Sequence, residues 1–159
     1  MKNILLTLLL GSVFIYGHNG HHIPITPYIS PGLQIGYNTD KTLFLSWQLT
    51  FGSGIKAGKH FEDTIPIFIG KTYGIRIYYV QKDSPKLFRY SENQISSIFG
   101  GFGRGKLIDK NGNSYNKNKF WLGGLGLITF EKIHFEDKVQ KHRSLSAVFP
   151  FPIEMAFVK

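Results

Sequence analysis

The chain has 159 residues, 15% of them aromatic, with 18 glycines, no cysteine and a formal net charge of +9 at pH 7. This length sets a limit of about one ordinary domain, and the lack of cysteine excludes a disulfide framework. Charged residues make up only 18% of the chain, below the roughly one quarter that is usual in soluble domains.

The first 17 residues have the form of a secretory signal peptide. Lys2 precedes an apolar run from Ile4 to Tyr16, and the small residue Gly17 follows it. The run is about 13 residues long, short of the roughly 20 that a membrane-spanning helix needs. We therefore predict cleavage after residue 17 and export of the remainder, whose formal charge falls from +9 to +8 with the loss of Lys2.

The positive charge that remains after cleavage indicates which class of molecule the protein contacts. Export and the scatter of the lysines over expected loops argue against nucleic acid. We expect membrane lipid instead, with the basic loops facing anionic lipid or the phosphates of lipopolysaccharide. The alternative is that these lysines are simply the solvated ends of loops.

Residues 18–28 form a turn-rich lead in which two prolines argue against a helix. Three histidines crowd this lead, His18, His21 and His22. With cleavage at the predicted point, the α-amino group and imidazole of His18 would chelate copper. With cleavage one residue later, Asn19-Gly20-His21 would have the spacing of a copper or nickel site. Because no carboxylate or thiolate accompanies the histidines, we predict a polar tether, no metal site and no cofactor.

A strict period of two runs from residue 29 to residue 51, interrupted by Asn38-Thr39-Asp40-Lys41. Successive side chains of a strand point to opposite faces, so the pattern predicts a β-hairpin with strands at 29–37 and 42–51. Neither strand carries a charge on either face, which is typical of a lipid-facing wall around a narrow lumen of Gly, Ser, Gln and Thr. The predicted lipid-facing band comprises Leu33, Ile35, Tyr37, Leu43, Leu45, Trp47, Leu49 and Phe51.

The same period returns in residues 65–79. We interpret this segment either as one long strand bent at Gly70 or Gly74, or as a tight hairpin at that point. Residues 87–90 are expected to form a short strand.

Residues 95–108 and 120–135 are expected to form a second hairpin around a loop at 109–118. Both arms are rich in glycine, which permits the sharp coiling of a small barrel and leaves room for aromatic rings. The rings that we expect to fill this room are those of Phe99, Phe102, Phe120 and Trp121.

Residues 136–143 are charged and predict a loop, and a final alternating run follows at 145–157. Pro150 and Pro152 in this run exclude pairing on both sides and fit the end or edge of a strand. The segments together predict an all-β fold: an antiparallel up-and-down β-barrel of six to eight strands over residues 29–159, after the cleaved signal peptide.

In the alternation of its first and last strands the chain resembles small bacterial outer-membrane β-barrels of the eight-stranded class. The resemblance covers most of residues 29–157 and is one of pattern, not of a diagnostic motif. It implies a closed barrel whose outer face meets lipid, and a location in the outer membrane. A periplasmic or secreted location is the alternative.

Catalytic chemistry has one candidate. His142, Ser144 and Glu154 resemble the His-x-Ser and downstream Glu of barrel lipid A deacylases, but Leu145 stands where that family has Asn. A charged loop beside a strand explains these residues equally well. Residues 109–113 have the oxygen-rich look of a calcium loop yet lack its later Glu, so a turn is the simpler interpretation. We therefore expect no enzyme activity.

Two functions follow from these patterns. The first is a small outer-membrane β-barrel with a structural or surface-interaction role, non-catalytic and too narrow to conduct solutes freely. The alternative is a soluble exported β-barrel or sandwich whose apolar residues point inward and bind a hydrophobic ligand. The two differ in which face of each strand meets water.

Overall fold

The computed structural model describes residues 25–55, 65–79, 84–123 and 126–153. Within these residues no helix is long and apolar enough to cross a membrane. The described residues form the strands β1 (Ile25–Asn38), β2 (Leu43–Ile55), β3 (Ile67–Tyr79), β4 (Lys86–Ser97), β5 (Gly100–Ile108), β6 (Ser114–Leu122), β7 (Gly126–His134), β8 (Val139–Val148) and β9 (Phe151–Pro152).

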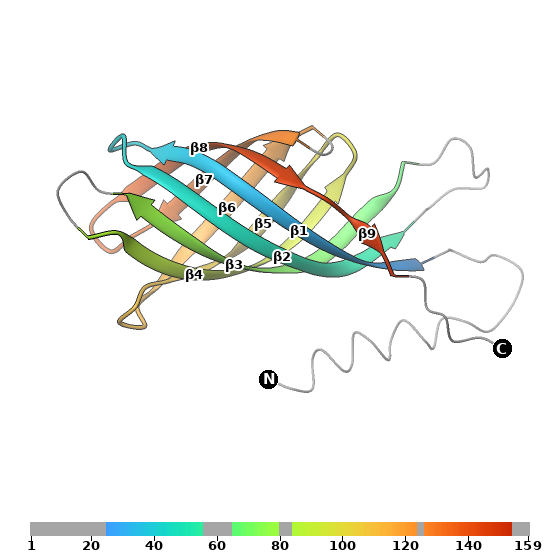
Figure 1. The fold of residues 1–159 in the computed structure, drawn as a ribbon, viewed down its shortest axis with the longest axis horizontal. Helices are drawn as coiled ribbons and strands as arrows, with labels where there is room; N and C mark the ends of the chain where they lie inside the picture. The colour runs from blue at the N-terminus through green and yellow to red at the C-terminus, as the bar shows by residue number, and fades with distance from the viewer. Residues whose placement is uncertain (1–24, 56–64, 80–83, 124–125, 154–159) are drawn as a thin grey trace, which may run out of the picture.

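Strands β1 to β8 close into one antiparallel barrel (Figure 1). Each strand pairs with its neighbours in the chain, and β8 pairs back onto β1. Following the pairing once around the barrel returns to β1 about ten residues further along, so the strands are strongly tilted against the barrel axis. The predicted fold, an up-and-down antiparallel barrel of up to eight strands, is confirmed.

The two ends of the barrel differ in what they carry. We call the end with the connections 39–42, 109–113 and 135–138 the turn end. The opposite end, where β1 begins and β9 lies, is the terminal end (right-hand side of Figure 1).

The short strand β9 continues β8 along the same edge of β1. Gly32 of β1 pairs with Val148 of β8, and Tyr28 of β1 pairs with Pro152 of β9 in the same register. Between them the N–H of Phe149 donates to the carbonyl of Pro31 at 3.0 Å. The ladder of β8 with β7 ends at Ala147. Among the described residues, the segment with the two prolines thus pairs with β1 alone, as predicted from the missing proline donors.

Several predicted element boundaries were wrong. Residues 67–79 form the single strand β3, so the interpretation as a tight hairpin is excluded. Residues 95–108 are not one arm of a hairpin, because the chain reverses between β4 and β5 at residues 98–99. Ile98 and Phe99 are the two central residues of that turn, and neither is the Gly, Asn or Asp that marks the centre of a short hairpin turn.

Three further strands begin earlier than predicted. β1 starts at Ile25, within the predicted lead. β6 starts at Ser114, inside the predicted loop 109–118, and β8 starts at Val139, inside the predicted charged loop 136–143. The start of β6 holds Lys and Asn, and the start of β8 holds Lys and Arg. These residue types predict a loop as long as it is not known that the lumen of the barrel is charged.

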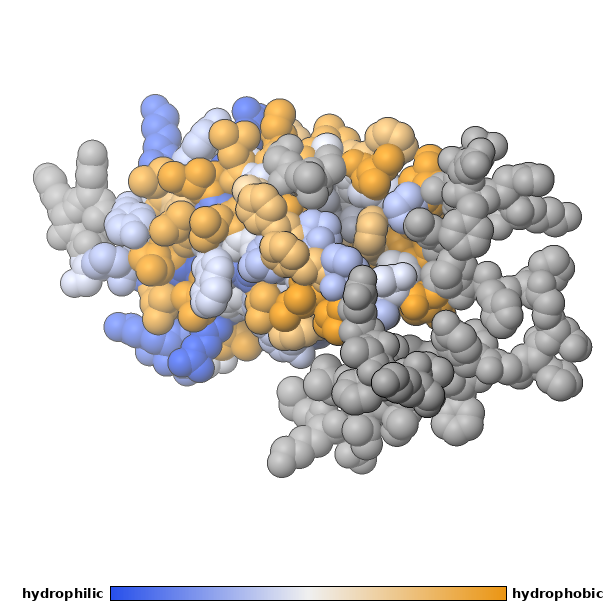
Figure 2. Space-filling model, turned by 45° about the vertical axis from the view of Figure 1, so that its right-hand side comes forward, coloured by the Kyte–Doolittle hydropathy of each residue, from blue (hydrophilic) through white to orange (hydrophobic). Residues whose placement is uncertain are grey.

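The outer wall of the barrel is apolar, and orange side chains cover much of it in Figure 2. All eight residues of the predicted band point outward; Trp47 is 58% exposed, and Leu49 is half-buried. The band continues onto the other strands through Ile75, Ile95, Phe102, Phe120, Ile128 and Leu145.

The four predicted ring fillers fall on both sides of the wall. Phe102 and Phe120 are exposed on the outside, because their positions on β5 and β6 face outward, and Phe99 is exposed in the turn between β4 and β5. Trp121 is buried inside, where its ring lies against Gly101, as predicted.

Candidate functional site

The lumen is organised in three layers, which the inward side chains of β6 show in order. From the turn end they are Tyr115, Lys117, Lys119 and Trp121. Tyr115 belongs to an aromatic layer, the two lysines to a cluster of ions, and Trp121 to the wall of a cavity. Because alternate residues of a strand share a face, the spacing of two residues places one side chain after another along the barrel axis.

Aromatic side chains fill the lumen at the turn end. Phe44 and Tyr78 have ring centroids 5.7 Å apart, and Tyr78 meets Phe88 edge-on at 5.3 Å. On the other side Tyr115 and Phe135 lie at 4.7 Å. Phe88, Tyr115 and Phe135 pack with the fully buried Leu107 and Ile133. We call this layer the aromatic plug; it closes the lumen at the turn end.

Five charged side chains meet in the middle of the lumen, and none is more than 4% exposed. Arg76 Nη1 lies 2.6 Å from Glu131 Oε2. Lys117 Nζ lies between both carboxylates, 2.8 Å from Glu92 Oε2 and 3.2 Å from Glu131 Oε1. Lys119 Nζ lies 2.8 Å from Glu92 Oε1. We call this group the ion cluster.

Polar and aromatic neighbours complete the ion cluster. The amide of Gln34 donates to Glu131 Oε1 at 3.1 Å and to Ser144 Oγ at 2.6 Å, while its carbonyl accepts from Arg76 Nη2 at 3.2 Å. Arg76 Nε donates to Ser46 Oγ at 2.7 Å. The Arg76 guanidinium also lies 4.2 Å from the ring centroid of Phe44. These contacts join side chains from β1, β2, β3, β7 and β8, so the cluster ties strands together across the lumen.

The ion cluster is not neutral. It holds three cations, Arg76, Lys117 and Lys119, against two carboxylates, Glu92 and Glu131. At least one positive charge is therefore in excess inside the barrel, and protonation of the neighbouring His142 would add a second. Lys119 is the member of the cluster that lines the cavity.

A cavity of about 360 Å³ occupies the lumen on the terminal-end side of the ion cluster. Its lining combines polar groups, Gln48, Thr50, Gln94, Lys119, Thr129 and Ser146 among them, with the rings of Tyr28, Phe68 and Trp121. The cavity and the plug thus lie on opposite sides of the ion cluster.

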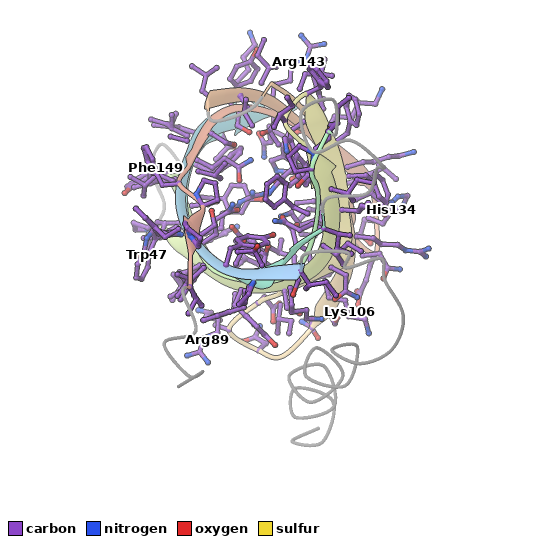
Figure 3. All side chains as sticks on the ribbon, turned by 90° about the vertical axis from the view of Figure 1, so that its right-hand side faces the viewer. Trp47, Arg89, Lys106, His134, Arg143 and Phe149 are labelled. Carbon is purple, nitrogen blue, oxygen red and sulfur yellow. The ribbon has the colours of Figure 1, made fainter. Side chains whose placement is uncertain are left out.

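The charges on the outer wall are of one sign, unlike the mixed charges inside. Both carboxylates of the described strands, Glu92 and Glu131, point inward, so outward-facing charged residues are cationic. We name five of them, in the turn-end part of β4, β5, β7 and β8, the basic belt: Arg89, Lys106, Lys132, Lys141 and Arg143. Figure 3 shows Arg89, Lys106 and Arg143 directed away from the barrel. We predicted the positive charge in loops, whereas these five cations stand on strands.

Of the deacylase-like residues, the two that the structure describes are not hydrogen-bonded to each other. His142 and Ser144 share the inner face of β8, as their spacing predicts, and both are buried. His142 Nε2 lies 3.0 Å from the Tyr78 hydroxyl, and Ser144 Oγ accepts from Gln34. Each therefore has a different partner, and Glu154 lies outside the described residues.

The other predicted sites have simple outcomes. His18, His21 and His22 lie outside the described residues, and within the described ones no group of three His, Cys, Asp or Glu side chains is placed to hold a metal ion. The calcium-like segment is a turn. The Asp109 carboxylate accepts from the backbone N–H groups of Asn111 at 2.8 Å and Asn113 at 2.9 Å, and Gly112 has a φ of 91°.

Sequence reasoning missed the ion cluster. Arg76 lies in the alternating segment 65–79, Glu131 in the predicted hairpin arm 120–135, and Lys117 in the predicted loop 109–118. The signal that could have found the cluster is the alternation of faces along a strand. Lys117 and Lys119 are two residues apart and share one face, and Glu131 lies on the face opposite to the apolar Ile128 and Phe130.

Fold and lumen together define a small eight-stranded antiparallel β-barrel with an apolar outer wall and a charged interior. The chain matches no family model, and the comparisons with curated proteins and with solved structures found no match.

Proposed function

We propose that the protein is an integral β-barrel of an outer membrane with a structural or surface-interaction role. The observation that carries the proposal is the polarity of the two faces of the wall. Large apolar side chains point outward from all eight strands, among them Leu145 at 64% exposure, whereas the inside holds five charged groups. In water, apolar side chains are more stable inside a protein and charged ones outside it. When lipid surrounds the barrel, apolar side chains are more stable on the outer face and charged ones in the lumen.

The soluble alternative requires the opposite arrangement. A water-soluble barrel or sandwich would place Leu33, Trp47 and their equivalents inside, around a hydrophobic ligand. These side chains are outside, and the sheet is a closed barrel. Soluble monomers rarely expose more than a few hundred Å² of continuous apolar surface, and here the apolar surface follows every strand.

The basic belt supports a membrane surface with anionic groups as the partner. Lys132 pairs directly with Lys141 between β7 and β8, and like charges in that position repel. Lipid phosphates, such as those of lipopolysaccharide, would neutralise them. The turn end would then lie at the more anionic surface of the membrane.

A non-conducting and non-catalytic role is the one that the lumen favours. The aromatic plug fills the turn end, so solutes have no continuous path through the barrel. His142 and Ser144 are engaged with Tyr78 and Gln34, and a nucleophile needs its base within hydrogen-bond reach.

Fractionation tests the proposal. The full chain is expressed in a Gram-negative host, and the washed envelope is extracted first with urea and then with detergent. We expect the protein to stay in the pellet through urea and to be released by detergent. Recovery of folded protein from the periplasm or culture medium without detergent would overturn the proposal.

A further inference from the structure

The terminal-end half of the lumen has the size of a small-molecule site. Its cavity of about 360 Å³ falls in the range of roughly 300 to 1,000 Å³ that such sites occupy. Barrels of eight strands are just wide enough either to be filled by side chains or to hold one small ligand. Here the turn-end half is filled, and the terminal-end half is hollow.

The walls of the cavity suit a ligand with an apolar body. Tyr28 and Phe68 meet edge-on at 5.5 Å, and Trp121 and Leu127 face the same space. Among the hydroxyls of the lining, those of Thr129 and Ser146 are satisfied by each other at 2.8 Å, and that of Thr50 is satisfied by Thr72 at 2.8 Å. They therefore make no strong demand on a ligand, and the rings supply most of the contact surface.

The inner boundary of the cavity carries the excess positive charge of the ion cluster. Lys119 Nζ donates to Glu92 Oε1 at 2.8 Å and to Gln48 Oε1 at 3.3 Å. Glu92 is shared with Lys117, which also contacts Glu131, so the carboxylates are not sufficient to neutralise all three cations. An ammonium group has three donors, and a buried charge without a counter-charge is costly. An anion next to Lys119 would remove that cost.

We propose that this cavity binds one small amphipathic molecule with a single negative charge: a monocarboxylate whose carboxylate lies at Lys119 and whose short apolar body lies between Tyr28, Phe68 and Trp121. The charge of the ion cluster sets the charge of the ligand, and the rings set its apolar part. This inference does not depend on what covers the outside of the barrel.

The two tryptophans of the chain allow a direct test, because Trp47 lies on the outer wall and Trp121 lines the cavity. The Trp47→Phe protein, purified in detergent, reports the cavity alone; the Trp121→Phe protein reports the outer wall alone. Both are titrated with 8-bromooctanoate, whose bromine quenches tryptophan fluorescence on contact, and with 8-bromooctanol as the neutral match. Partition of the probe into detergent quenches Trp47 without saturation and thus serves as the control.

We expect saturable quenching of Trp121 by the carboxylate, with an affinity at least tenfold higher than for the alcohol. Adding Lys119→Met to the Trp47→Phe protein should remove this difference. Adding Ser146→Phe, which fills the cavity and leaves Lys119 in place, should remove the saturable phase.

Two results would overturn the inference. One is quenching of Trp121 that never saturates, as for Trp47. The other is equal affinity for acid and alcohol, which would show an apolar cavity without a role for Lys119. If Lys119→Met does not fold, the ratio of acid to alcohol affinity in the parent protein and the Ser146→Phe variant still decide.

Discussion

We expect Glu131 to stabilise the lumen more than any single cation of the ion cluster does, because the cluster holds only two carboxylates against three cations. It contacts Arg76 at 2.6 Å and Lys117 at 3.2 Å and accepts from the Gln34 amide. Glu131→Gln would leave three cations facing one carboxylate in a fully buried site. Removing one partner of a buried ion pair typically costs about 3–5 kcal/mol. We expect a loss of that size in the free energy of unfolding, measured by urea titration of the protein folded in lipid vesicles.

Lys119→Met is the matched control for this prediction. It also removes one charged member of the cluster, but it leaves two cations and two carboxylates, a balanced set. We expect it to cost less than half as much as Glu131→Gln. Equal losses for the two variants would contradict the charge count and would indicate that packing alone decides the stability of this layer.

Among the elements, two turns at the turn end are joined by an ion pair. Lys138, between β7 and β8, lies 2.7 Å from Asp40, between β1 and β2, and the side-chain amide of Gln140 donates to the same carboxylate at 2.7 Å. The hydrogen bond from Lys138 holds the pKa of Asp40 below its usual range. A carboxyl with a lowered folded-state pKa stabilises the protein above its unfolded-state pKa, near 3.9, and loses this effect as pH falls through the folded-state value.

Asp40→Asn should therefore be slightly less stable than the parent at neutral pH, and the difference should vanish in acid. It should also shrink at high salt, because both side chains are about half exposed. Unfolding curves from pH 7 to pH 2 measure this. Asp137→Asn is the control, since among the described residues Asp137 makes no ion pair. A difference that persists in acid would mean that the effect of Asp40 is not electrostatic.

The strands differ in how well the sequence predicts them, and the reason is the polarity of the two sides of the wall. Residues 29–51 are apolar outside and uncharged inside, so alternation identifies both strands and their turn. In β6 the inside is charged and the outside holds Asn116 and Asn118, so neither face looks like a strand. The turn at Ile98 and Phe99 is hidden because its residues are as apolar as the wall.

The candidate site is harder to predict than the fold. Trp121 is one of the rings predicted to fill the room beside the glycines, and its ring lies against Gly101 and lines the cavity. The ion cluster forms only because the register between strands brings together Arg76, Glu92 and Glu131, which are far apart in the sequence. Alternation within one strand does not determine the register between strands.

For the whole molecule, the basic belt predicts a preference between membranes. Replacing Lys106, Lys132 and Lys141 by Gln removes three positive charges from the outer wall. Each Lys or Arg near an anionic surface contributes about 1 kcal/mol. We expect the stability gained on moving from phosphatidylcholine vesicles to vesicles containing phosphatidylglycerol to fall by up to about 3 kcal/mol.

The charge-conserving replacement of the same three lysines by Arg is the control and should keep the full preference. If the Gln and Arg variants respond alike to anionic lipid, these side chains do not contact the headgroups, and the belt is merely solvated.

The apolar wall allows the sharpest test of the environment of the whole barrel. Leu145 points outward, and its partners in the neighbouring strands are Ile35 and Ile128. Asn116 also points outward, but its partners are Lys106 and His134, at the level of the basic belt.

In lipid, an added Arg costs about 2–4 kcal/mol near the bilayer midplane and about 0–1 kcal/mol near the interface. Leu145→Arg should therefore lose about 2–4 kcal/mol of unfolding free energy in phosphatidylcholine vesicles, while Asn116→Arg should lose about 1 kcal/mol or less. In water both positions would accept Arg equally, since both side chains are exposed. Equal tolerance of the two substitutions would thus place water, not lipid, outside the wall, and would leave the exposed apolar surface to be explained by contact with another protein.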